Sequence, residues 1–449
     1  MTNRLMAGVM EAFAAMTNRL HSWWDVNAFI VSTLSPPSIL RVSVWCIVFF
    51  GGLLLWIGDL VSGAWIAVVV GFLGLAKDVL SVITRWVTSP RMSLKKDEGS
   101  LTLFSRMELS QDYVDAKYEI YQVSGHSDEY VVRSPRVDAS LRTNDFKVEQ
   151  HQELLKPINE GLRKISPVLE DALRCQYRRS WRADPPQQFV NEGKICVGSD
   201  LFAPPGPIKI YRGSYFHSFL TNDLVTSILE SYGTRPQILY RGSERFPAFP
   251  QNDGVYKLKR IPESLMGNHV GISTVVHTSD DQIVLWRQSN RAQQSGDYIA
   301  PTGSGSCDWE DFGRASRTSS LKTLVSIAME REFREESHPL ESALRGIAIK
   351  TSILGYFRWV RRGGKPEFVG ISKIEAPVSK LDANISEVDA PEHLQLVYPA
   401  GTVAQLQSSI AALLASERLS VPLWVNLTCL KEALNNETEQ WTEFLTIPP

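Results

Sequence analysis

The longest apolar stretch of the chain lies near its N-terminus. From Val42 to Ala76, about 35 residues contain a single charged side chain, Asp59. One straight helix of that length would measure roughly 50 Å, well beyond a bilayer core of about 30 Å. The pattern therefore predicts a two-pass transmembrane hairpin within residues 41–88, with passes of about 17 residues on either side of a turn at Gly58 and Asp59.

The charges that flank this stretch set its expected orientation. Arg41 precedes it and Lys77 follows it, whereas the turn carries no basic residue. Basic residues concentrate on the cytoplasmic side of membrane proteins. We therefore expect a multi-pass protein of the cell inner membrane, with both termini and the large C-terminal part in the cytoplasm. Residues 1–40 are expected to form an amphipathic or interfacial lead-in. The alternative for the hairpin is a buried helical pair in a soluble domain.

The C-terminal part alternates between strand-like and helix-like patterns. Strands are predicted at Val270–Val276, Gln282–Arg287, Ile353–Val360 and Phe368–Ile374. A turn region rich in glycine is predicted at Tyr298–Ser306, and helices are predicted at Ser320–Glu336, Val403–Glu417 and Val421–Asn435. This order predicts an α/β domain over residues 255–449, closed by terminal helices.

The segment between the hairpin and this domain follows no simple pattern. Residues 100–250 contain a strand candidate at Ile208–Tyr211 and a helix candidate at Asp223–Ser231, separated by loops rich in proline. We expect a cytoplasmic region there and assign it no fold.

Composition narrows the class of partner. The net charge is −2 and the pI is about 6.5, so the chain lacks the basic footprint of a DNA-binding protein, and no DNA partner is expected. The five cysteines are isolated along the sequence and show no metal-ligand spacing.

The most distinctive short run is Arg-Glu-Phe-Arg-Glu-Glu, from Arg331 to Glu336. On a helix it places Glu332, Glu335 and Glu336 on one face, because residues three and four apart are neighbours. Clustered carboxylates suit a hard cation such as Mg²⁺, which also bridges nucleotide phosphates. The alternative is an ordinary solvated acidic face of a helix.

In its context, this run resembles the Nudix hydrolase motif. That motif reads Gly, five residues, Glu, seven residues, Arg-Glu-hydrophobic-x-Glu-Glu, one residue, Gly, and its second half is present here. Its first glycine and first glutamate are replaced by Arg317 and Thr323, and its closing glycine is replaced by His338. The resemblance implies a Nudix-like α/β/α sandwich, and the missing glutamate and glycines favour nucleotide binding over hydrolysis.

Further site residues follow from the same analogy. Glu332, Glu335 and Glu336 are implied to hold Mg²⁺ or, if vestigial, to line a pocket. The implied nucleotide-binding residues are Arg287 for a phosphate, the backbone at Gly303 and Gly305 for phosphate oxygens, and Tyr356 and Trp359 for a base. For the two aromatic residues the alternative is core packing, and for the two glycines it is a plain surface loop.

A membrane hairpin followed by a degenerate Nudix core resembles the SMODS-associated Nudix-domain effectors of the bacterial CBASS antiviral systems. That resemblance implies a cyclic oligonucleotide ligand, made by a CD-NTase partner, that triggers homo-oligomerisation in the lipid bilayer, disruption of the inner membrane and abortive-infection cell death. The alternatives are a membrane-tethered, Mg²⁺-dependent Nudix pyrophosphatase acting on nucleoside diphosphate derivatives, and an inert membrane scaffold.

Overall fold

The computed structural model describes most of the chain. The described residues are 17–34, 46–54, 57, 65–88, 92–183, 189–202, 206–232, 236–246, 251–252, 255–287, 298–316, 319–337, 346–381, 395–416 and 418–446. They fall into two compact units. Unit 1 comprises residues 1–96, 156–191 and 227–241, and unit 2 comprises residues 97–155, 192–226 and 242–449. The predicted region 100–250 is therefore shared between two units.

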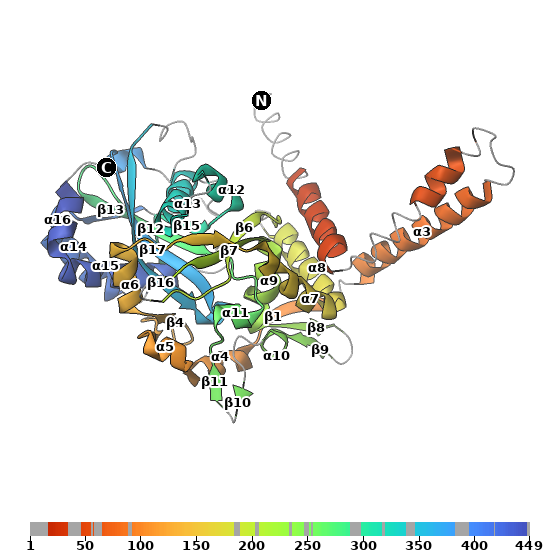
Figure 1. Cartoon of the computed structure of the whole chain (residues 1–449), viewed down its shortest axis with the longest axis horizontal. Helices are drawn as coiled ribbons and strands as arrows, with labels where there is room; N and C mark the ends of the chain where they lie inside the picture. The colour runs from red at the N-terminus through yellow and green to blue at the C-terminus, as the bar shows by residue number, and fades with distance from the viewer. Residues whose placement is uncertain are drawn as a thin grey trace, which may run out of the picture. The chain divides into compact units, whose positions relative to one another are not determined.

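In unit 1, a helix over residues 46–54 packs against α3 (Trp65–Thr88) (Figure 1). Small residues bring the two helices together. A Cβ added at Gly71 would lie 2.5 Å from the backbone nitrogen of Phe49, and one added at Gly52 would lie 2.8 Å from Cβ of Ala67. Glycine is therefore required at both positions. The predicted turn at Gly58 and Asp59 lies outside the described residues.

The outer surface of this helical pair is apolar. Its exposed large hydrophobic side chains are Ile47, Phe50, Leu54, Trp65, Ile66, Val69, Val70, Phe72, Leu73 and Leu80. Within the part of the chain that the structure describes, no helix is both long enough and apolar enough to cross a bilayer.

The rest of unit 1 is a small α/β assembly. A helix over residues 17–29 continues into η1 (Ile30–Leu34) and buries Phe29 against its neighbours. The other elements are α7 (Leu155–Lys164), α8 (Ser166–Arg182), β1 (Met92–Lys96), β8 (Ser227–Ser231) and β9 (Gln237–Arg241). The predicted helix at Asp223–Ser231 is wrong, because β8 pairs antiparallel with β1 and β9.

Unit 2 is built on a mixed nine-stranded sheet with the order β14-β13-β12-β17-β16-β4-β3, in which β15 also pairs with β12 and β18 with β13. The bounds are β3 (Glu119–Gln122), β4 (Tyr130–Arg133), β12 (Gly271–His277), β13 (Gln282–Arg287), β14 (Ile299–Ala300), β15 (Gly303–Ser306), β16 (Ile349–Trp359), β17 (Lys365–Ile374) and β18 (Gln395–Pro399). The parallel pair β12–β17 lies at its centre. The four predicted C-terminal strands are thus confirmed as β12, β13, β16 and β17.

Helices cover both faces of this sheet. On one face, α13 (Leu321–Glu336) packs through Phe333 against Val276 and Trp286. On the other face, α14 (Val403–Leu414), α15 (Val421–Asn436) and α16 (Thr438–Thr446) pack against residues such as Val275 and Leu285 (Figure 1). Neighbouring residues of one strand point to opposite faces, so the two clusters define two layers. The result is an α/β/α sandwich, as predicted.

The remaining elements of unit 2 surround this core. The helices are α4 (Glu98–Phe104), α5 (Gln111–Asp115), α6 (Pro135–Thr143), α9 (Tyr215–Thr221), α10 (Gly242–Arg245), α11 (Ile261–Ser264) and α12 (Trp309–Arg314). Two three-stranded sheets have the orders β5-β7-β6 (Val148–Gln150, Ile208–Ser214, Gly193–Val197) and β10-β11-β2 (Gln251–Asn252, Val255–Lys257, Met107–Glu108). The strand predicted at Ile208–Tyr211 is confirmed as the first part of β7.

Candidate functional site

The acidic run occupies the last turns of α13, beside β15. The helix begins after Ser320, whose hydroxyl accepts a hydrogen bond from the backbone N–H of Thr323 at 3.1 Å. Thr323 stands where the Nudix motif has its first glutamate, and here it belongs to the helix N-terminus. Glu332 and Glu336 face β15, and Glu335 is the most exposed of the three glutamates.

A buried arginine organises these carboxylates. Arg331 donates Nε and Nη2 to the two oxygens of Asp311, at 2.9 and 3.0 Å. Its Nη1 donates to Glu332 at 3.0 Å and to Glu335 at 2.8 Å, and Nη2 also donates to the carbonyl of Ser306 at 2.8 Å. A guanidinium has five N–H donors, so all of them are engaged.

The glycine-rich segment is a strand, β15, and its N–H groups are already used. The N–H of Ser304 donates to Glu336 at 3.0 Å, and the N–H of Ser306 donates to Glu332 at 3.1 Å. A Cβ at Gly303 would lie 2.9 Å from the backbone of Phe333, and one at Gly305 would lie 2.2 Å from the carboxyl carbon of Glu332. The two predicted phosphate-binding glycines instead let α13 approach the sheet.

Burial changes the acidity of this cluster. It raises the pKa of Glu332 to about 7, against the opposing charge of Arg331 and with help from the charge of Glu335. Burial by itself would lower the pKa of Arg331, but the hydrogen-bonded Asp311 and the other carboxylates raise it. Arg331 therefore stays charged, whereas Glu332 titrates near neutral pH.

This arrangement does not fit a magnesium site. Glu332 and Glu335 both accept hydrogen bonds from Arg331, Glu332 and Glu336 accept hydrogen bonds from backbone N–H groups of β15, and the positive charge that a cation would supply comes from Arg331. Across the described ranges, no three histidine, cysteine, aspartate or glutamate side chains come together as a metal site. Because Arg331 already neutralises these carboxylates, we assign no metal-dependent step to the cluster.

The structure does not bring Arg287 to the glutamates. Its neighbour Trp286 packs with Phe333 of α13 and donates Nε1–H to the carbonyl of Thr302 at 3.0 Å. Side chains alternate along a strand, and Leu285 belongs to the cluster on the opposite face. Arg287 therefore lies on the sheet face away from α13.

The two aromatic candidates are core residues. Tyr356 is 1% exposed and packs against Phe368, with ring centroids 5.1 Å apart. Trp359 is 7% exposed, and its Nε1–H donates to Glu129 at 2.8 Å. Both side chains are buried in unit 2, as the core-packing alternative expects.

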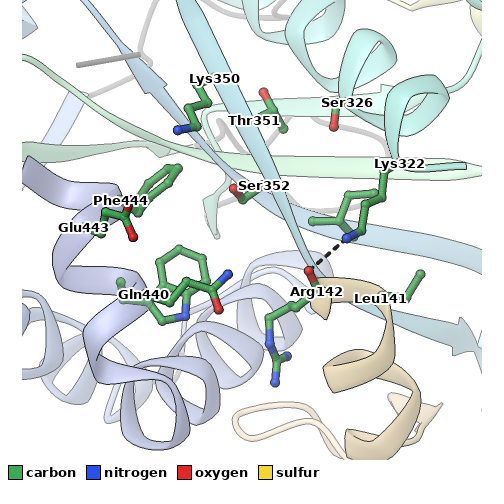
Figure 2. Close-up of a pocket in the computed structure, with 12 residues that line it drawn as sticks. Leu141, Arg142, Lys322, Ser326, Lys350, Thr351, Ser352, Gln440, Glu443 and Phe444 are labelled. Atoms are coloured by element: carbon green, nitrogen blue, oxygen red, sulfur yellow. Dashed lines mark hydrogen bonds between the residues drawn. The ribbon is translucent and has the colours of Figure 1, made fainter. Parts of the chain in front are cut away.

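Sequence reasoning missed a pocket of about 280 Å³ elsewhere in unit 2 (Figure 2). It is lined by residues of α6, α13, β16 and α16: Leu141, Arg142, Lys322, Ser326, Lys350, Thr351, Ser352, Ile353, Gln440, Trp441, Glu443 and Phe444. Figure 2 shows Lys322 reaching across to the backbone carbonyl of Arg142, at 2.9 Å. These residues come from segments far apart in sequence, so no local motif marks them.

Sequence comparison matches the chain to no family model and to no curated protein. The solved structures that are similar to part of it include the following two proteins. DR0079 from Deinococcus radiodurans is 15% identical over 36% of this chain and 81% of that chain, with a TM-score of 0.23. A MutT protein from Methanosarcina mazei Go1 is 15% identical over 38% of this chain and 96% of that chain, with a TM-score of 0.24. Similarity at this level carries no conclusion about activity.

Proposed function

We propose that this protein is a membrane effector whose Nudix-like unit binds a nucleotide and does not hydrolyse it. The observation that carries the proposal is the apolar outer surface of the helical pair in unit 1. Phe50, Leu54 and Phe72 are each more than half exposed there, at 56%, 72% and 58%. Clustered exposed apolar side chains of this kind favour contact with lipid or another protein.

The Arg331 network supports binding over catalysis. A metal-dependent hydrolase needs carboxylates that converge on a cation. Here Glu332 and Glu336 accept hydrogen bonds from β15, and Glu335 pairs with Arg331. The carboxylates stabilise the packing of α13 on the sheet.

A CBASS-type response is the signalling role that fits an apolar helical pair combined with an α/β unit. In our proposal, a cyclic oligonucleotide from a CD-NTase partner binds the α/β unit and favours homo-oligomers, whose apolar helices then disrupt the inner membrane. A ligand shifts such an equilibrium by its differential affinity for the two states. A change from 1% to 99% active requires the ligand to bind the active state about 10⁴-fold more tightly than the inactive state, or by about 5.5 kcal/mol. Assembly of several copies lowers the binding free-energy difference that each site must supply.

Membrane depolarisation in bacteria that express the full chain tests this role. Cells that co-express a nucleotidyltransferase making cyclic di- or trinucleotides should depolarise, and cells lacking the nucleotide should not. Gly71→Leu should abolish the effect, because its side chain would meet the backbone of Phe49. Gly51→Leu is the matched control, since nothing lies within 4 Å of a Cβ at Gly51. Absence of depolarisation with every cyclic nucleotide would refute the effector role.

The enzymatic alternative has one observation in its favour. Glu332, Glu335 and Glu336 share the end of α13, as a Nudix pyrophosphatase requires. That alternative predicts Mg²⁺-dependent cleavage of nucleoside diphosphate derivatives, abolished by Glu335→Gln or Glu336→Gln. Detection of such cleavage would replace the receptor proposal with a membrane-tethered hydrolase.

A further inference from the structure

The pocket between α6, α13, β16 and α16 is positively charged. Arg142, Lys322 and Lys350 line it, and Glu443 is its one acidic lining residue; with the Glu437 that pairs with Arg142, one positive charge is in excess. The three basic residues belong to three elements, Arg142 to α6, Lys322 to α13 and Lys350 to β16 (Figure 2).

Arg142 and Lys350 differ in their charged partners. Arg142 forms an ion pair with Glu437, to which its Nε donates at 2.9 Å, and its Nη1 donates to the carbonyl of Leu354 at 2.9 Å. Lys350 is exposed and pairs with no carboxylate among the described residues. In the β16–β17 ladder it lies directly opposite Lys373, and like charges in that position repel. A bound anion would relieve this repulsion.

The pocket wall also carries hydroxyl groups. Ser326, Thr351 and Ser352 line the pocket beside its basic residues, and their hydroxyls can donate hydrogen bonds to the oxygens of an anion.

We propose that this pocket binds a phosphate-bearing ligand no larger than about one nucleotide unit. Ligand pockets usually measure about 300–1,000 Å³, so 280 Å³ accommodates a small ligand or one nucleotide of a larger one. The choice of a nucleotide among phosphate-bearing ligands rests on the proposed function. The preference for an anion rests on the pocket alone.

Isothermal titration calorimetry on the detergent-solubilised full chain tests the site, with adenosine monophosphate and inorganic pyrophosphate as probes. At least one probe should bind, and added salt should weaken that binding because charge attraction is screened. Lys350→Glu should weaken it about tenfold or more, and Lys350→Arg should retain it. Lys431→Glu on α15 makes the same charge change at an exposed position outside the pocket and should leave affinity unchanged.

No binding of either probe at millimolar concentration, or equal weakening by Lys350→Glu and Lys431→Glu, would overturn the proposal. Membrane depolarisation tests the effector role separately. If the full chain binds pyrophosphate but does not depolarise cells, the effector role is refuted and the anion-binding pocket is retained.

Discussion

The guanidinium of Arg331 donates two parallel hydrogen bonds to the carboxylate of Asp311, from Nε to Oδ1 at 2.9 Å and from Nη2 to Oδ2 at 3.0 Å. Asp311 belongs to α12, where its side chain also closes the N-terminal capping box with Asp308. The pair thus ties the acidic end of α13 to the short helix before it. Bidentate pairs of this kind are the stronger and more specific form of charged hydrogen bond.

Arg331→Gln should strongly destabilise unit 2. Removing one partner of a buried ion pair leaves the other charge uncompensated and typically costs 3–5 kcal/mol. Arg314 supplies the matched control, because it also faces Asp311, at 3.7 Å, yet its side chain is 53% exposed. Urea unfolding of both variants should give a loss of about 3–5 kcal/mol for Arg331→Gln and under about 1 kcal/mol for Arg314→Gln. Equal losses would show that the Arg331 network adds nothing to stability.

Gly303→Ala should destabilise the contact between β15 and α13. The new Cβ would lie 2.9 Å from backbone atoms of Phe333, which cannot rotate away. Overpacking of this kind costs about 1–3 kcal/mol. Gly313→Ala is the control, because nothing lies within 4 Å of its Cβ and alanine favours the α12 helix. Thermal unfolding should show a lower midpoint for Gly303→Ala alone, and an unchanged midpoint for both variants would contradict the packing described.

Lowering the pH should reduce the unfolding free energy of unit 2, because His217 is buried there. Burial lowers the pKa of this side chain from 6.5 to about 4, and its Nδ1 lies 2.7 Å from the hydroxyl of Ser214. Between these two pKa values the unfolded chain binds a proton that the folded chain excludes, so stability falls as the pH drops from about 6.5 to 4.

His217→Gln removes this titration. Between pH 7.5 and pH 5, the variant should lose about 2 kcal/mol less unfolding free energy than the wild type. His151→Gln, at a partly exposed position, is the control. Identical pH profiles for the wild type and His217→Gln, measured by urea unfolding, would contradict the assignment of a neutral buried imidazole.

Local pattern predicted the fold wherever the chain alternates strongly. The apolar and β-branched runs at β12, β13, β16 and β17 were readable for this reason. The Gly-Ser-Gly-Ser strand β15 was not, because glycine and serine have low strand propensity and its pairing depends on a helix close above it. The helix expected at Asp223–Ser231 failed because β8 is fixed by pairing with the distant β1.

The same limit applies to the site. The spacing of Glu332, Glu335 and Glu336 correctly placed three carboxylates at one end of a helix. The pairing of these carboxylates with Arg331 could not be predicted from spacing. Asp311, which holds Arg331 in place, lies twenty residues upstream and contacts it only in the folded chain. The cationic pocket was missed for a related reason, since Arg142 is separated from Lys322 by 180 positions.

The most direct test of the account is flotation of the purified full chain with phospholipid vesicles. The apolar helical pair should carry the protein upward with the vesicles, and a high-salt wash should not release it, because apolar contacts are not screened by salt. Charged substitutions at Phe50 and Phe72, both exposed, should reduce flotation. A full chain that stays at the bottom of the gradient with every lipid mixture would contradict the proposed membrane role.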